Sequence, residues 1–144
     1  MDSSQYRELF IEEAREHIAA LTKSLLILEK DQQNMELVNM LFRSAHTLKG
    51  SSGMMGYTDL QELTHAMESI FDDMRRGSRP SSNLISVLLE CVDALSSKLE
   101  NIQNMIEQEI DVESFTQKLQ EATELSLLEE SKETQAPPLS LIHI

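Results

Sequence analysis

A histidine followed closely by a lysine and two glycines is the part of the sequence best suited to chemistry. In the stretch from His46 to Gly53, Lys49 comes three positions and Gly50 four positions after the histidine. At about 100° per residue, a helix through this stretch puts His46, Gly50 and Gly53 on one side, with Lys49 beside them. The imidazole therefore stands exposed at the edge of a core, where a ring nitrogen can act as a nucleophile.

The presence of two glycines in this predicted helix calls for an explanation, because each destabilises a helix by about 1 kcal/mol relative to alanine. A glycine has no side chain to keep a neighbouring molecule at a distance. We therefore expect Gly50 and Gly53 to be where a partner docks beside His46.

A carboxylate on the following helix is expected to lie level with the histidine. The sequence predicts a tight turn around Tyr57, with His46 eleven residues before it and Glu68 eleven residues after it. In two antiparallel helices both positions are then roughly 16 Å from the turn. A carboxylate that accepts a proton from one ring nitrogen fixes the tautomer and leaves the other nitrogen as the nucleophile. Lys49 can neutralise an anionic group on that nitrogen, whereas His65 lies further round towards solvent.

Three other kinds of site fit the sequence poorly. A nucleotide-binding loop has its glycines before its lysine and follows a strand, whereas Lys49 precedes Gly50 within a helix. The segment 62–65 is a single Glu-x-x-His motif, but diiron bundles need two such motifs and further inward glutamates. No serine has the strand-to-helix setting of a hydrolase nucleophile. The sequence therefore predicts neither a cofactor site nor a metal site.

The first three predicted helices follow from apolar residues that recur every three or four positions. One covers residues 2–29, where Asp2 and Gln5 form a start signal, and a polar break at 30–34 separates it from the helix that carries His46. The third begins with a capping-box pattern at Thr58 and ends at 75–77, where two arginines precede a glycine.

The rest of the chain predicts two more helices and a tail. An apolar stripe from Leu84 to Met105 indicates a long fourth helix, and Asp111 can cap a shorter fifth. No alternation of period two is sustained, so the fold class is all-α, an antiparallel up-down four-helix bundle with an additional C-terminal helix. We expect the bundle to occupy residues 1–128 and a disordered linker or tail to occupy 129–144.

Composition narrows the function classes. The formal net charge of -13 disfavours binding to nucleic acid or to anionic membranes. The single Cys91 cannot form an internal disulfide, and no apolar run approaches the roughly 18 residues of a membrane span. The N-terminal residues do not resemble a secretion signal. These features predict a cytoplasmic protein.

The stretch His46-Thr47-Leu48-Lys49-Gly50-Ser51-Ser52-Gly53, followed by His65-Ala66-Met67-Glu68, resembles the histidine phosphotransfer (HPt) domain. More specifically, it resembles the N-terminal phosphotransfer domain of the chemotaxis histidine kinases, the CheA family. The resemblance extends over residues 1 to about 128. It implies that His46 is phosphorylated, that Glu68 orients its imidazole, that Lys49 lies near the phosphoryl group, and that His65 joins the same polar network.

The resemblance also implies the partners. A separate kinase domain of the parent protein would transfer the γ-phosphoryl of ATP to His46, and a response regulator of the CheY or CheB type would accept it on an aspartate. ATP and Mg²⁺ would come with those domains, so this chain alone would not act on ATP, and the parent kinase would associate with chemoreceptor complexes. Two alternatives remain: a passive helical interaction module and, more distantly, a metal-binding bundle.

Overall fold

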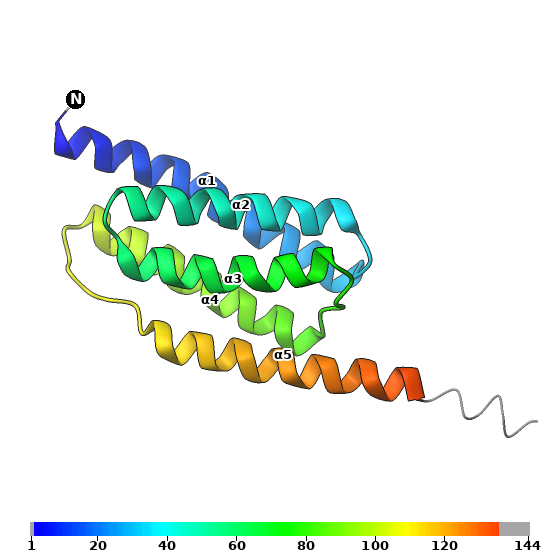
Figure 1. The fold of residues 1–144 in the computed structure, drawn as a ribbon. Helices are drawn as coiled ribbons and strands as arrows, with labels where there is room; N and C mark the ends of the chain where they lie inside the picture. The colour runs from blue at the N-terminus through cyan, green and yellow to red at the C-terminus, as the bar shows by residue number, and fades with distance from the viewer. Residues whose placement is uncertain (1, 136–144) are drawn as a thin grey trace, which may run out of the picture.

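The chain folds into a bundle of helices, and the all-α prediction is confirmed. The computed structural model describes residues 2–135, with side chains to residue 129, and contains no strand within that range (Figure 1). The helices are α1 (Ser3–Lys30), α2 (Met35–Met54), α3 (Thr58–Arg75), α4 (Ser82–Gln103) and α5 (Val112–Gln135). Helices α1 to α4 form the four-helix bundle, and α5 lies along α3 and α4. None of the described helices is long and apolar enough to span a membrane.

Local capping explains where several helices begin and end. The start signal predicted at Asp2 and Gln5 is confirmed, and in the structure these two residues form a capping box at the start of α1. The capping box predicted at Thr58 is wrong, because the N-cap of α3 is Tyr57 and has no side-chain cap hydrogen bond. At the other end of α3, Gly77 has a φ of +112°, the left-handed conformation that glycine adopts without strain.

Helix α5 is longer than the sequence predicts. It continues past residue 128, the expected end of the bundle, to Gln135. Its residues Leu119 and Ala122 are buried, whereas Leu125 and Leu128 are exposed. A helical backbone can persist beyond the stretch that packs against the bundle when its residues have high helix propensity. The end of the buried apolar face therefore does not mark the end of α5. The rest of the expected tail, 136–144, lies outside the described residues.

Apolar side chains from α1 to α4 fill the centre of the bundle, with a smaller contribution from α5. Cys91 of α4 is buried in this core, and burial raises the pKa of its thiol to about 12. This cysteine therefore packs as a small protonated apolar side chain.

Helices α2 and α3 form the hairpin that positions the site. The turn between them is closed by a 2.9 Å hydrogen bond from Tyr57 N to Ser52 O, and Gly56 has a φ of +83°. Positions equally distant from Tyr57 face each other, as the contact of Gly53 with Gln61 shows near the turn. The two helices run side by side along their whole length (Figure 1), which extends the same register to the middle of α2.

Candidate functional site

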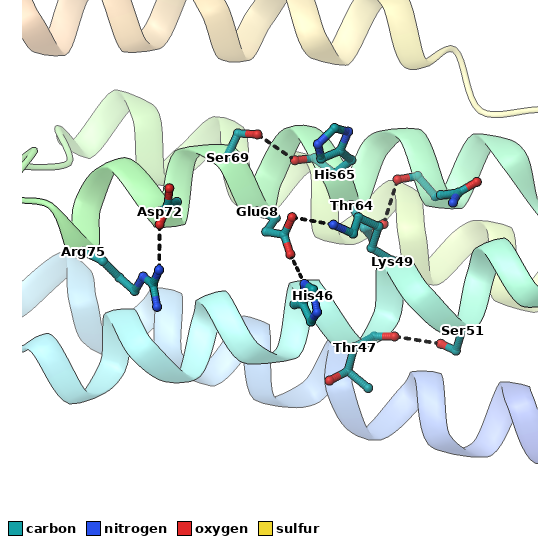
Figure 2. A network of polar contacts seen from close by, with 11 residues as sticks. His46, Thr47, Lys49, Ser51, Thr64, His65, Glu68, Ser69, Asp72 and Arg75 are labelled. Carbon is teal, nitrogen blue, oxygen red and sulfur yellow. Dashed lines mark hydrogen bonds and ion pairs between the residues drawn. The ribbon is translucent and has the colours of Figure 1, made fainter.

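An exposed histidine on α2 is held by a buried carboxylate on α3. His46 Nδ1 is hydrogen-bonded to Glu68 Oε2 (Figure 2), as the register around Tyr57 predicts. Because an ionised carboxylate only accepts hydrogen bonds, Nδ1 carries the proton and Nε2 of the neutral ring keeps a free lone pair. The side chain of His46 is 63% exposed and that of Glu68 is 11% exposed. The imidazole is thus open to solvent, while the carboxylate that holds it is not.

Lys49 occupies the second oxygen of the same carboxylate. Its Nζ donates a 2.7 Å hydrogen bond to Glu68 Oε1. Burial opposes ionisation of Glu68, but the hydrogen bonds from Lys49 and His46 outweigh it and hold the pKa of the carboxyl below its ordinary value. Glu68 therefore stays anionic at neutral pH, and the His46 tautomer stays fixed.

His65 does not join this network. Its side chain is exposed on α3, and within the described residues its ring has no hydrogen bond or ion pair. Besides its helical backbone bonds, its backbone carbonyl accepts a 3.2 Å hydrogen bond from Ser69 Oγ (Figure 2). His65 precedes Glu68 by three residues, so it lies about 60° round the helix from it. This position turns the His65 ring away from α2. The helical-wheel argument was right, and the network implied by the motif is not formed.

The two glycines differ in their surroundings. A Cβ at Gly53 would lie 2.5 Å from Gln61 Nε2, whereas a Cβ at Gly50 would meet nothing within 4 Å. The close approach expected at Gly53 is therefore made by α3 of the same chain. Gly50 is exposed beside Lys49, and its role in docking stays a prediction.

Phe42 lies next to His46 and Arg75 lies over Phe42, although sequence reasoning assigned neither residue to the site. The Phe42 and His46 rings lie within 12° of parallel, with centroids 6.1 Å apart. The guanidinium carbon of Arg75 is 3.7 Å from the Phe42 centroid. The available signal was that Phe42 is four residues before His46 and so lies next to it along one helix face.

A second buried carboxylate, also missed, lies near the start of α3. Asp59 Oδ2 forms a 3.0 Å ion pair with Lys98 of α4 and accepts a 2.9 Å hydrogen bond from Ile110 N. Lys98 Nζ donates a further 2.6 Å bond to Gln108 O. Burial opposes ionisation of Asp59, but these donors prevail and its pKa is lowered. This network fastens the loop before α5 to the bundle.

No group of three or more His, Cys, Asp or Glu side chains within the described residues is arranged to hold a metal ion. The contacts of the site are instead a histidine, its carboxylate and a lysine on two adjacent helices. A four-helix bundle that displays such a histidine defines a class of protein: a helical module with an exposed imidazole held by a carboxylate of the neighbouring helix.

The family follows from comparison with known proteins. The family model described as "Hpt domain" matches residues 5–108, a range that contains His46, Lys49 and Glu68. The chain therefore belongs to the Hpt domain family, the histidine phosphotransfer domains. The resemblance predicted from the histidine and lysine motif is confirmed.

Relatives place the chain within that family. It is 40% identical over 120 residues to the chemotaxis protein CheA of Bacillus subtilis, a match that covers 83% of this chain and 18% of the relative. The CheA phosphotransferase domain from Thermotoga maritima is 34% identical with a TM-score of 0.68, and the match covers 71% of this chain and 98% of that one.

A third likeness concerns the fold alone. The phosphorylated P1 domain of a CheA from R. sphaeroides, solved in complex with a CheY protein, has a TM-score of 0.74 at 22% identity. That match covers 85% of this chain and 98% of the solved chain. The chain spans only 18% of the length of the Bacillus subtilis CheA protein, so it corresponds to one module of that longer relative.

Proposed function

We propose that His46 accepts a phosphoryl group and passes it on to a response regulator. Nε2 attacks the γ-phosphorus of ATP held by a separate kinase domain, the bond from that phosphorus to the β,γ-bridging oxygen breaks, and ADP leaves. In the second step an aspartate oxygen of the regulator attacks the phosphorus, and the bond to Nε2 breaks. The observation that supports this function most directly is the hydrogen bond between His46 Nδ1 and Glu68, which places the lone pair of the neutral ring at Nε2.

Glu68 has two roles in this proposal. It fixes the reactive tautomer before transfer, and it neutralises the ring once Nε2 has bonded to phosphorus, because the ring is then a cationic imidazolium. Its lowered pKa keeps it ionised for both roles. Orientation and charge stabilisation supply most of the catalysis of phosphoryl transfer.

Lys49 is proposed to face the transferred phosphoryl group. Its ammonium uses one N–H donor on Glu68 Oε1 and has two more for phosphoryl oxygens. Its side chain is 26% exposed, so those donors can be reached from the surface that carries His46.

The proposed partners are inferred from the relatives. The kinase domain would belong to the same parent protein and bring ATP and Mg²⁺, and the regulators would be of the CheY or CheB type. The solved P1 domain in complex with a CheY protein supports this choice of partner. The parent kinase would act in the cytoplasm at chemoreceptor complexes.

The test is phosphorylation by a CheA kinase domain in the presence of radiolabelled ATP and Mg²⁺. We expect acid-labile label on the wild-type chain, none on His46→Gln, and none on the wild type when the kinase domain is omitted. His65→Gln is the matched control and should be labelled like the wild type, because its ring lies outside the network. Equal labelling of wild type and His46→Gln would exclude His46 as the acceptor. A chain that binds the kinase domain but takes no label would be a passive interaction module.

A further inference from the structure

We propose that Phe42 and Arg75 position the His46 imidazole for phosphoryl transfer. Phe42 stacks against one face of the ring, and Arg75 holds Phe42 in place. The kinetic part of this inference rests on the proposed function of His46, while its structural part can be tested without any phosphoryl transfer. Neither side chain touches the reacting atoms, so both are positioning residues.

A single hydrogen bond does not fix the plane of an exposed ring. Glu68 holds His46 at one atom, Nδ1, and the imidazole can still turn about that contact because its side chain is 63% exposed. The nearly parallel Phe42 ring supplies a second restraint on the ring plane. A centroid separation of 6.1 Å lies within the range in which offset aromatic pairs attract each other. The two contacts together define the direction of the Nε2 lone pair.

Arg75 completes the restraint from α3. Its guanidinium carbon lies 3.7 Å from the Phe42 centroid, well inside the range of cation–π attraction. It is anchored by a 2.8 Å hydrogen bond to Asp72 Oδ1, one turn earlier on α3 (Figure 2). Asp72 follows Glu68 by four residues, as Phe42 precedes His46 by four. Two adjacent contacts therefore cross the α2–α3 hairpin. One joins His46 Nδ1 to Glu68, and the other joins Phe42, the neighbour of the imidazole, to Arg75.

The neighbouring arginine provides a matched control. Arg76 also pairs with Asp72, at 3.2 Å, and its side chain is 77% exposed. Arg75→Gln and Arg76→Gln each remove one positive charge and one ion pair to the same carboxylate at the end of α3. Arg75 is the one of the two that lies over Phe42, so a difference between these variants reports on the Phe42 contact rather than on net charge.

The structural test is NMR spectroscopy of the unphosphorylated chain. The ring current of Phe42 should displace the carbon-bound proton resonances of the His46 imidazole. We expect Phe42→Leu to abolish that displacement, Arg75→Gln to reduce it, and Phe42→Tyr and Arg76→Gln to retain it. Circular dichroism of each variant checks that the bundle is folded. His46 resonances that are unchanged in Phe42→Leu would overturn the inference.

The kinetic test uses phosphoramidate as a small donor and the CheA kinase domain with ATP as a large one. With phosphoramidate, Nε2 bonds to phosphorus as the P–N bond breaks and ammonia leaves, so no protein docking is involved. We expect Phe42→Leu to slow both reactions about threefold to tenfold and Arg75→Gln about twofold to fivefold. Phe42→Tyr and Arg76→Gln should stay within about twofold of the wild type.

The outcomes separate this inference from the proposed function. If the wild type takes no phosphoryl group from either donor, the proposed function fails, and the His46 resonances still decide whether Phe42 restrains the ring. If the wild type is phosphorylated and Phe42→Leu reacts at the same rate with both donors, the positioning role is overturned. A variant slowed only with the kinase domain would also overturn it, since that pattern indicates a docking contact.

Discussion

Helix α3 carries two buried carboxylates with nearly the same chemistry and different consequences. Asp59 and Glu68 each pair with a lysine from a neighbouring helix and each accept a second hydrogen bond. At Asp59 the lysine is 7% exposed and the second donor is the backbone of Ile110. At Glu68 the lysine is 26% exposed and the second donor is a histidine that is 63% exposed.

The difference lies in whether one partner of the carboxylate is left open to solvent. The Asp59 network is closed, so its interactions serve only to hold α3, α4 and the loop before α5 together. In the Glu68 network, one of the hydrogen bonds goes to the exposed imidazole of His46, which another molecule can reach. A carboxylate paired with a lysine therefore fastens the fold at one end of α3 and holds an exposed imidazole in its middle.

Removing the lysine from each network should give the largest difference between them. Lys98→Met leaves Asp59 as a buried charge without its partner, so we expect the free energy of unfolding to fall by about 3–5 kcal/mol. Lys49→Met acts on a pair closer to solvent and should cost about 1 kcal/mol. Urea denaturation followed by circular dichroism measures both. Equal losses would mean that the two networks do not differ in structural importance.

Neutralising the carboxylates should reverse the order for function. Glu68→Gln keeps an amide oxygen that can accept from His46 Nδ1 but removes the negative charge beside the developing imidazolium. Since hydrogen bonds to charged groups contribute about 1.5–3 kcal/mol, we expect phosphorylation of His46 to slow about tenfold to hundredfold. Glu68→Ala, which also loses the orientation of the ring, should be slower still. Initial rates of labelling by the kinase domain provide the measurement.

The control for that experiment is Asp59→Asn, assayed where its circular dichroism shows that it is folded. It should be phosphorylated at the wild-type rate, because Asp59 has no contact with the His46 network. A slow Asp59→Asn variant would show that the two networks are coupled through α3, and a normal rate for Glu68→Gln would remove charge neutralisation from the mechanism.

Sequence reasoning located the Glu68 network and missed the Asp59 network for a physical reason. A tight turn fixes the register of two antiparallel helices, and a constant rise per residue then places His46 level with Glu68. The Asp59–Lys98 pair instead depends on how α4 and the loop before α5 pack against α3, which no local pattern specifies. The Phe42 and Arg75 stack was missed in a similar way, since it depends on side-chain conformations across the hairpin.

Two further mismatches have local causes. The motif implied a network role for His65, but position on the helix decides where a ring points, and the wheel had placed it towards solvent. The predicted end of the bundle at residue 128 falls short of the end of α5 at Gln135. The reason is that a loss of apolar periodicity marks the end of packing rather than the end of a helix. Patterns therefore predicted buried faces better than helix ends.

The two glycines of α2 repeat the comparison on a smaller scale. Gly53 faces Gln61 of the same chain, and Gly50 faces open space. We expect Gly50→Ala to raise the free energy of unfolding by about 0.5–1 kcal/mol through helix propensity. Gly53→Ala should gain less, because its Cβ would displace the Gln61 amide. Thermal unfolding of the two variants measures this difference, and an equal gain would show that the Gln61 amide moves aside at no cost.

The rate of phosphoryl transfer to the regulator tests whether Gly50 has a role in docking. If Gly50 is kept for docking, Gly50→Ala should be the more stable protein and the slower donor, with reactivity towards phosphoramidate unchanged. A methyl group at this position lies beside Lys49 and His46 without touching other parts of the bundle, so any loss would arise from the incoming partner. Transfer at the wild-type rate would assign the glycine no docking role and leave its cost to helix α2 without a functional reason.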